Sequence, residues 1–501
     1  MQLLIEREIE AEARKRIAKY SRDRYYISKY RAAFKKRTGK KAKIAPKHTP
    51  LSWDFHPHFD PRYCINHAKF LAKGIWASLQ AGIYKPLKSQ RLEIEKASGG
   101  TRHIDTFSVP DAVVAKIFMN NLRQRNAKIF SDSSYAYQLN KTTLDAVIRL
   151  KSTITTETMF ISQYDFSKYF DSIKHDYIEE IIGKSGPFLT TKMERQILLA
   201  TIKHEYEDRS GNSGVRNRGI PQGNSLSLFL ANAVAHSLDT ELSMLNGIFA
   251  RFADDSVVVN RSYEDALSCA DAYHRFSERS GVSINLEKSS GIRIFSDTPA
   301  EMAHIDEFNF LSYRFTRKGL DISERAILNI KRRCARIIYN HLLLHPKRTS
   351  SYSKKRIGRG FRDWELVTCL NELRAFIYGG KSQEMVDKYL NGDANLKNLS
   401  GAVSYFSLVE SSAGFRALDG WLVSAIYRAY RARAALLSKV GKKTVKSISE
   451  AQLISGSWYK LEAFPLETQL PSFFTAWRAS RKSWLQHGLG GINPQGMGYS
   501  Y

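Results

Sequence analysis

The sequence predicts an α+β fold in which a region of mixed strands and helices precedes a nearly all-helical region. Between about residues 90 and 315, short runs rich in β-branched residues alternate with helical patterns. Beyond residue 320 the helical pattern dominates. Helices are expected there over 323–345, 361–378, 383–390, 400–411 and 414–439. The length of 501 residues is enough for about three domains.

The composition indicates a nucleic-acid partner and an intracellular setting. The formal net charge is +28, and such an excess of Lys and Arg is typical of proteins that neutralise phosphates. The four cysteines are far apart and form no C-x-x-C pair, which argues against a zinc ribbon or a disulfide framework and favours a reducing cytoplasm. We expect no signal peptide and no membrane partner, because no apolar stretch of about 18 residues occurs.

Two adjacent acids, Asp254 and Asp255, form the centre of the predicted site. They precede a run of three valines, 257–259, which is typical of a strand, so the acids are expected at a tight turn that enters it. Their charges repel each other, and a divalent cation would offset that repulsion. Asp165, at the end of another expected core strand, is the candidate third carboxylate. Taken alone, an acid such as Asp165 is more often a helix cap than a metal ligand.

Two further segments have the composition of a nucleotide pocket. Lys96 and Arg102 flank a Ser-Gly-Gly turn between two expected strands, and two cations on one hairpin could hold a triphosphate. The Pro-Gln-Gly turn at 221–223 leads into an apolar helix, and such a loop can bring backbone close to a flat ligand.

Five motifs in fixed order resemble the palm of reverse transcriptases. The resemblance is to the lineage of group II intron enzymes and of bacterial defence-associated enzymes of the unknown-group and abortive-infection type, and it covers roughly residues 80–315. The motifs lie at 165–171, 221–223, 252–255, 285–289 and 310–313. Finger elements from Lys96 and Arg102 through 134–137 match as well.

The resemblance implies a right-hand polymerase with fingers and palm, the palm being an antiparallel sheet flanked by helices, followed by an α-helical thumb and a C-terminal region. The expected ranges are a basic N-terminal arm or helix at 1–55, fingers at 56–160, palm at 161–318, a maturase-like thumb at 319–440, and a segment of unknown role at 441–501.

The resemblance also implies catalytic roles. Asp165 and Asp254 would hold two Mg²⁺ ions, with Mn²⁺ as an alternative, and Asp255 would support them. The backbone carbonyl of Phe166 would complete the metal shell. Lys288 would approach the pyrophosphate and act as a general acid.

The same resemblance assigns the nucleotide pocket and the primer site. Phe170 would face the sugar and favour deoxynucleotides, and Gln222 would line the pocket. Lys96 and Arg102 would neutralise the triphosphate. The primer end would be supported by the grip residues Leu311 and Tyr313, where Ser312 replaces a common glycine.

The implied activity is RNA-directed DNA polymerisation, in which dNTPs are added to a primer on an RNA template. We expect antiphage defence with a dedicated structured non-coding RNA, since no Cys-rich endonuclease module follows the thumb. A maturase-like RNA-binding or splicing protein is the alternative. Priming on the hydroxyl of Tyr499 or Tyr501 and assembly as a homo-oligomer both stay open.

Overall fold

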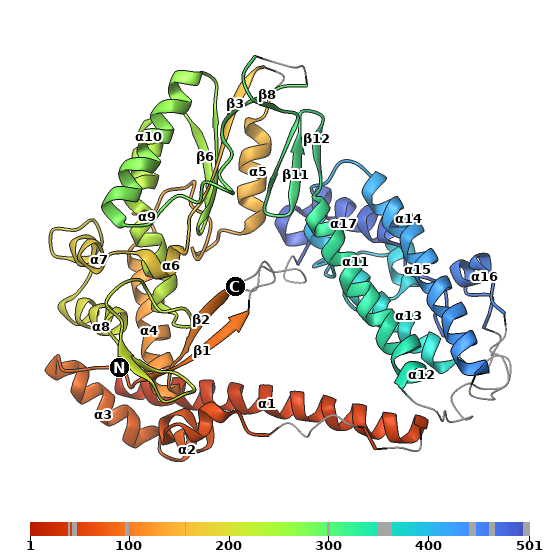
Figure 1. The fold of residues 1–501 in the computed structure, drawn as a ribbon, viewed down its shortest axis with the longest axis horizontal. Coiled ribbons are helices and arrows are strands. Elements are labelled where there is room, and N and C mark those ends of the chain that lie inside the picture. Colours follow the sequence, from red (N-terminus) through yellow and green to blue (C-terminus); the bar gives the residue numbers. More distant parts are fainter. Residues whose placement is uncertain are drawn as a thin grey trace. The chain divides into compact units, whose positions relative to one another are not determined.

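The computed structural model describes residues 1–38, 41–42, 48–95, 100–155, 157–297, 301–348, 363–439, 447–459 and 466–493. The chain forms two compact units. The first comprises Met1–Tyr25 and Pro46–Asp306, and the second comprises Tyr26–Ala45 and Glu307–Tyr501. Sheets and helices occur in both units, so the predicted α+β class is confirmed (Figure 1). The ranges expected for fingers, palm and thumb stay a prediction.

A five-stranded sheet organises the first unit, and its order is β6-β7-β3-β8-β9. Its strands are β3 (Met159–Asp165), β6 (Ile248–Phe252), β7 (Asp255–Asn260), β8 (Gly291–Phe295) and β9 (His304–Ile305). The central strand β3 pairs antiparallel with β7 on one side and β8 on the other. The valines of β7 are buried, as their β-branched run predicts.

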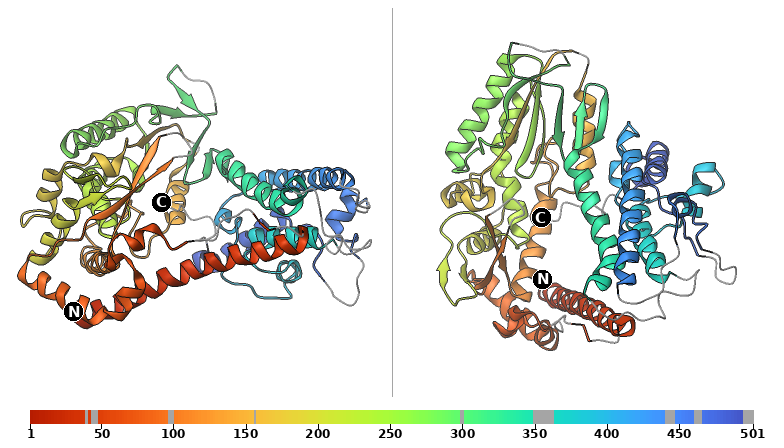
Figure 2. Two further views of the ribbon diagram at one scale, coloured as in Figure 1. Left: turned by 60° about the horizontal axis from the view of Figure 1, so that its bottom comes forward. Right: turned by 45° about the vertical axis from the view of Figure 1, so that its right-hand side comes forward.

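Helices surround this sheet, and α9 and α10 pack against it (Figures 1 and 2). The helices that begin in the first unit are α1 (Gln2–Thr38), α2 (Pro61–Asn66), α3 (Ala68–Ala81), α4 (Val109–Arg125), α5 (Thr143–Thr153), α6 (Tyr169–Ser172), α7 (His175–Ile182), α8 (Lys192–Ile202), α9 (Leu226–Met244) and α10 (Tyr263–Ser280). Short 3₁₀ turns lie at Leu51–Asp54 and Pro57–Phe59. Most apolar residues of α9 are buried, so this helix lies at the centre of the hydrophobic core.

A second sheet of four strands carries the predicted hairpin. Its order is β2-β1-β4-β5. The strands are β1 (Ser89–Glu95), β2 (Thr101–Thr106), β4 (Glu205–Glu207) and β5 (Ser213–Val215). The pairing of β1 with β2 confirms the hairpin and places Arg102 opposite Ile94. Lys96 lies outside the described residues.

The second unit joins a small sheet to a set of helices. The sheet has the order β10-β11-β12, with β10 (Glu307–Phe310), β11 (Tyr313–Thr316) and β12 (Gly319–Ile322). The helices are α11 (Glu324–Ile338), α12 (Leu344–Arg348), α13 (Trp364–Tyr378), α14 (Gln383–Asn391), α15 (Ala413–Ser438), α16 (Glu450–Ser455) and α17 (Phe473–His487). Tyr339–Leu343 is a π-helical turn between α11 and α12, and 3₁₀ turns lie at Ser404–Phe406 and Gly488–Gly491.

One predicted helix of this unit is wrong. Instead of a helix over 400–411, the chain has turns and the single 3₁₀ turn Ser404–Phe406. Gly401 has φ = +109°, and a Cβ there would lie 2.4 Å from the carbonyl oxygen of Ile377. The segment is therefore shaped by its close approach to α13, which helical periodicity does not reveal.

The β10–β11 hairpin closes with a two-residue turn. Leu311 and Ser312 both have positive φ, at 48° and 69°, which is the pattern of a type I′ turn. The hydroxyl of Tyr405 donates to the carbonyl oxygen of Leu311 at 2.9 Å, and the hydroxyl of Tyr313 donates to the carbonyl oxygen of Tyr405. These two bonds hold a turn that residues with side chains adopt at a cost. Within the described residues, no helix is both long and apolar enough to cross a membrane.

Candidate active site

Asp165 lies at the end of β3, where the 285–289 loop contacts it from the other side. Its Oδ2 accepts a hydrogen bond from Asn285 Nδ2 at 3.1 Å and an ion pair from Lys288 Nζ at 3.1 Å. Its backbone carbonyl accepts from the N–H of Asn285 at 2.8 Å. The Asn-x-x-Lys motif therefore positions the Asp165 carboxylate and brings a cation to it.

The Asp254–Asp255 pair lies at the predicted tight turn. Ala253 has φ = +59°, so the chain reverses there before Asp255 begins β7. Asp255 is directly opposite Asp165 in the β3–β7 register. Side chains of directly opposed residues project to the same face, with Cβ atoms about 5 Å apart. The fold thus brings together the carboxylates that the sequence placed 90 positions apart.

The pKa of Asp254 is raised above its usual value in this cluster. Burial raises the pKa of its carboxyl, and the negative charge of Asp165 raises it further. Arg102 and Lys288 act in the opposite direction on the same pKa. Burial also raises the pKa of the Tyr137 hydroxyl to about 12, with Asp254 contributing. Strand β2, the 134–137 loop, β3 and the Asp-Asp turn therefore meet around one acidic centre.

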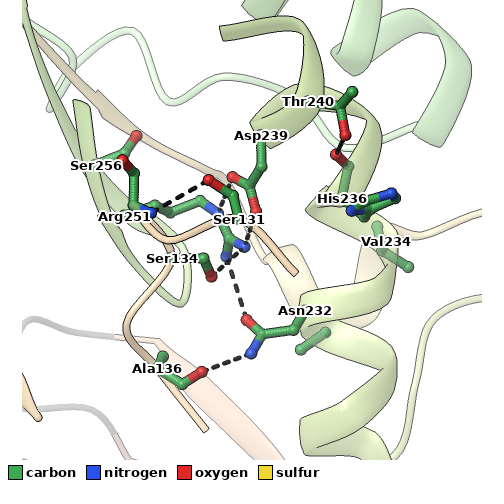
Figure 3. Close-up of polar contacts among 12 residues, drawn as sticks. Ser131, Ser134, Ala136, Asn232, Val234, His236, Asp239, Thr240, Arg251 and Ser256 are labelled. Atoms are coloured by element: carbon green, nitrogen blue, oxygen red, sulfur yellow. Dashed lines mark hydrogen bonds and ion pairs between the residues drawn. The ribbon is translucent and has the colours of Figure 1, made fainter. Parts of the chain in front are cut away.

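Arg251 anchors the turn, and Figure 3 shows its side chain reaching toward Asp239, Ser134 and Asn232. Its side chain is completely buried and forms a bidentate ion pair with Asp239 of α9, at 2.7 and 2.5 Å. The same guanidinium donates to the carbonyl oxygen of Ala253 at 2.8 Å and to Ser134 Oγ at 2.8 Å. Burial alone would lower the pKa of Arg251, but the carboxylate of Asp239 raises it above its usual range.

The arginine also ties the 131–137 loop to the sheet. The backbone N–H of Arg251 donates to the carbonyl of Ser133, and its carbonyl accepts from Tyr135, both at 2.9 Å. Asn232 accepts from Arg251 and donates to the carbonyl of Ala136 (Figure 3). Sequence reasoning missed this network. The available signal was a charged residue in each of two apolar elements, Arg251 in β6 and Asp239 in α9.

The Pro-Gln-Gly loop packs against the four-stranded sheet. The N–H of Asp105 donates to the carbonyl of Gln222 at 2.8 Å. Gly223 has φ = +113°, and a Cβ there would lie 2.4 Å from the carbonyl oxygen of Asp105. The glycine is therefore required by both conformation and space. The side chain of Gln222 donates to Asp171 Oδ2 at 3.5 Å, at the start of α6.

A buried charge cluster fixes that loop. Asp105 is fully buried and accepts from Arg91 at 2.9 Å and Arg216 at 2.7 Å. Burial would raise its pKa, but these two arginines lower it below its usual value. His204 lies 3.7 Å from the same carboxylate, and burial lowers the histidine pKa to about 4. The histidine is therefore neutral at pH 7.

The two phenylalanines of the first motif have different surroundings. Phe166 is buried among the rings of Tyr169, Tyr273 and Phe276, so its side chain belongs to the core. Phe170 is partly exposed, and its carbonyl accepts from the N–H of Ile220 at 2.7 Å, directly before the Pro-Gln-Gly loop. That contact joins the candidate sugar-facing residue to the candidate nucleotide loop.

The remaining predicted residues lie elsewhere. Leu311 and Tyr313 belong to the second unit, and both side chains are buried there, with Tyr313 against the rings of Tyr405 and Phe406. Of the turn, Ser312 is the partly exposed residue, and the primer-grip role of Leu311 and Tyr313 stays a prediction.

The carboxylates suit a hard divalent cation whose shell is completed by other oxygens. Among the described residues, no group of three His, Cys, Asp or Glu side chains could hold a metal ion by itself. Mg²⁺ usually takes one or two protein carboxylates, with waters and substrate phosphates as the other ligands. The mutual repulsion that raises the pKa of Asp254 beside Asp165 is the property that such a cation relieves.

Comparisons with known proteins agree with this geometry. Residues 94–315 match the family model described as reverse transcriptase (RNA-dependent DNA polymerase). A COX1/OXI3 intron 2 protein of Saccharomyces cerevisiae is 26% identical over 178 residues, which is 36% of this chain and 20% of that protein. An uncharacterized 91 kDa protein in a cob intron of Schizosaccharomyces pombe is 27% identical over 180 residues, or 34% of this chain and 21% of that protein. The match therefore spans about a fifth of the length of these relatives.

Among solved structures, apo telomerase from Candida tropicalis aligns at a TM-score of 0.38 and 12% identity, covering 89% of this chain and 76% of that one. Telomerase from Candida albicans aligns at a TM-score of 0.38 and 10% identity, and the alignment covers 75% of this chain and 66% of that one. The family match is the finding that identifies the site. Residues 94–315 match a reverse transcriptase domain, as the order of the five motifs predicts.

Proposed function

We propose that this chain adds dNTPs to a primer on an RNA template, with Asp165, Asp254 and Asp255 as the catalytic carboxylates. The observation that carries the proposal is the meeting of Asp165 and the Asp-Asp turn in a reverse transcriptase domain. Two Mg²⁺ ions held by these side chains and by the Phe166 carbonyl would activate the primer hydroxyl and stabilise the leaving pyrophosphate.

The cations of the site have separate roles in the proposal. Lys288 holds Asp165 in place at 3.1 Å and is exposed, so its ammonium can also reach a departing pyrophosphate as a general acid. Arg102, which lies on β2, acts to lower the pKa of Asp254. Together with Lys96, it would neutralise the negative charge of the triphosphate. Both roles place positive charge where negative charge develops.

The discrimination between sugars is assigned to Phe170. Its ring packs edge-on against Tyr169 at 5.9 Å, and its backbone is fixed to Ile220. A rigid ring beside the sugar would exclude a 2′-hydroxyl, and Gln222 would line the same pocket. Phe170→Val should therefore increase incorporation of rNTPs relative to dNTPs by about tenfold, measured by primer extension with each nucleotide set. An unchanged ratio would remove Phe170 from this role.

The main test is primer extension with Mg²⁺ by the purified chain and by a double variant. Asp254→Asn with Asp255→Asn should reduce dNTP incorporation by at least about 10²–10³-fold, because the electrostatic stabilisation is lost. RNA binding should persist, since it depends on the basic surface. Asp271→Asn with Glu278→Gln is the matched control, because both acids are exposed on α10 and their replacement removes the same two charges outside the site. Normal polymerisation by the double variant would refute the metal-site assignment.

Two biological roles remain candidates. We propose antiphage defence with a dedicated structured RNA as the first. The second is a maturase-like RNA-binding role, which the similarity to proteins of yeast introns favours. Sequencing the RNA that copurifies with the chain separates them, because one small structured RNA is expected for the first role and intron RNA for the second. The same experiment, with the newly made DNA included, identifies template and product.

A further inference from the structure

A basic cavity of about 580 Å³ lies between α14, α15 and α17, within the second unit. We call it the α17 cavity. Its lining includes four cations and two aromatic rings, and it contains no acidic side chain. These residues are Arg416, Phe474, Trp477, Arg478, Arg481 and Lys482. Most of them belong to α17, in the C-terminal segment to which the sequence assigned no role.

None of the four cations forms an ion pair within 4 Å with a carboxylate among the described residues. The acid close to them is Asp419, whose carboxylate accepts from the N–H groups of Phe473 and Phe474 and whose pKa Arg416 acts to lower. Arg481 donates to the carbonyl of Val409 at 2.7 Å, and Lys482 donates to the carbonyl of Tyr389 at 2.7 Å. Arg416 donates weakly to Ser412 Oγ at 3.4 Å. Arg478 is exposed and contacts the ring of Phe474. Each of these side chains keeps donors available for a ligand.

This arrangement differs from that of structural arginines in the same unit. Arg433 is fully buried and pairs with Asp363 and Glu365, and Arg374 pairs with Glu467. Where arginine serves packing in this unit, an acid therefore accompanies it. Three of the four cations, Arg478, Arg481 and Lys482, lie close together on α17 without an ion pair, so they repel one another and an anionic ligand would stabilise them.

The aromatic residues indicate what else that ligand carries. The guanidinium of Arg416 lies 3.8 Å from the centroid of the Phe474 ring. Phe474 in turn stacks on Trp477 at 5.9 Å, with 30° between the rings. Such a flat stack of arginine and aromatic rings is a platform for a nucleobase, and bases stack both on aromatic rings and on guanidinium planes.

We propose that the α17 cavity binds a single-stranded nucleic acid segment. A base stacks on the Arg416–Phe474 platform, and flanking phosphates pair with Arg478, Arg481 and Lys482. The cavity uses residues of the second unit alone, whereas the catalytic carboxylates belong to the first. The inference therefore goes beyond the proposed polymerase activity and does not depend on it.

The test measures binding by the full chain in EDTA, where no polymerisation occurs. Fluorescein-labelled 12-nucleotide uridine RNA and its DNA counterpart are titrated by anisotropy at several salt concentrations. The double variant Arg478→Gln with Arg481→Gln should weaken binding by about tenfold and lower the slope of log affinity against log salt by about 1.4, because two phosphate contacts are lost. The RNA and DNA arms show which of the two nucleic acids the cavity prefers.

The control removes the same charge from exposed positions outside the cavity. Arg428 and Arg431 lie on α15 and are not part of the lining. Arg428→Gln with Arg431→Gln should change the affinity by less than about threefold. If the two double variants weaken binding equally, the cavity has no special role and the proposal is wrong.

A second variant tests the platform rather than the charge. Phe474→Leu should weaken binding by about tenfold at an unchanged salt slope, because stacking is lost and phosphate pairing is kept. An unchanged affinity would overturn the stacking assignment. RNA that contains 4-thiouridine should crosslink to the peptide that contains α17. If hepta-glutamate competes for the site more strongly than unlabelled RNA does, the occupant is an acidic protein and the proposal is wrong. Thermal unfolding of each variant confirms that the fold is retained.

Discussion

Replacement of Arg251 should destabilise the catalytic turn more than any single loss of a surface charge. The side chain is completely buried, and its removal leaves the Asp239 carboxylate without its bidentate partner and the Ala253 carbonyl without its donor. An uncompensated buried charge costs about 3–5 kcal/mol. We therefore expect Arg251→Met to lower the free energy of unfolding of the first unit by that amount.

Hydrogen exchange measured by mass spectrometry is the suitable assay, since it reports on each segment of a chain with two units. Peptides covering 131–137 and 248–260 should exchange about two to four orders of magnitude faster in Arg251→Met, which is the equivalent of 3–5 kcal/mol. Arg251→Lys should have a smaller effect of about 1–3 kcal/mol, because it keeps the charge and loses the forked geometry.

The double variant Arg251→Met with Asp239→Leu separates stability from positioning. Removal of both charges should restore much of the lost stability, because no unpaired ion remains in the core. Primer extension should stay impaired, since the carbonyl of Ala253 still lacks its donor beside Asp254. If the effects of the two single changes on exchange simply add, the two side chains do not interact and the reasoning is refuted.

Three further predictions concern the loops around the site and the hairpin. Gly223→Ala should cost about 1–3 kcal/mol and impair primer extension, because φ is +113° and the new Cβ meets the Asp105 carbonyl; Gly74→Ala, with nothing within 4 Å, should instead stabilise by about 0.5–1 kcal/mol. The folded pKa of His204 is lowered from 6.5 to about 4, so its stabilising contribution is complete above pH 6.5 and is lost as the pH falls through 4. The free energy of unfolding, measured in urea at several pH values, should fall by about 3 kcal/mol over this range in the wild type and by less in His204→Gln. An equal fall in both proteins would contradict this prediction. Ser312→Gly should raise the midpoint of thermal unfolding by the equivalent of about 1 kcal/mol, because φ is 69° there, and a lower midpoint would argue against the type I′ turn.

Local patterns were sufficient for several parts of the site. A β-branched run after two acids predicted the turn and strand β7, and alternation around a Ser-Gly-Gly segment predicted β1 and β2. These elements are encoded in neighbouring residues, because strand propensity and turn chemistry act over a few positions. The order of the five motifs then predicted the reverse transcriptase domain, which the family match confirms.

Other parts depended on distant segments. The helix predicted over 400–411 does not form, because Gly401 comes close to the backbone of α13 and the chain turns there. The α17 cavity is partly local, because Phe474, Trp477, Arg478, Arg481 and Lys482 recur at helical spacing along α17. Only the fold adds Arg416 of α15 to them, so that part depends on which backbones come close together.

By itself, the sequence predicted the centre that we propose for this protein: three acids, a lysine and a glycine turn in an order typical of a polymerase. The tertiary structure alone decided how that centre is supported. Arg251 contacts Asp239, Ala253 and Ser134 at once, and these partners lie on a helix, a turn and a loop. A buried guanidinium needs several acceptors in fixed directions, and only the folded chain brings those acceptors to one point.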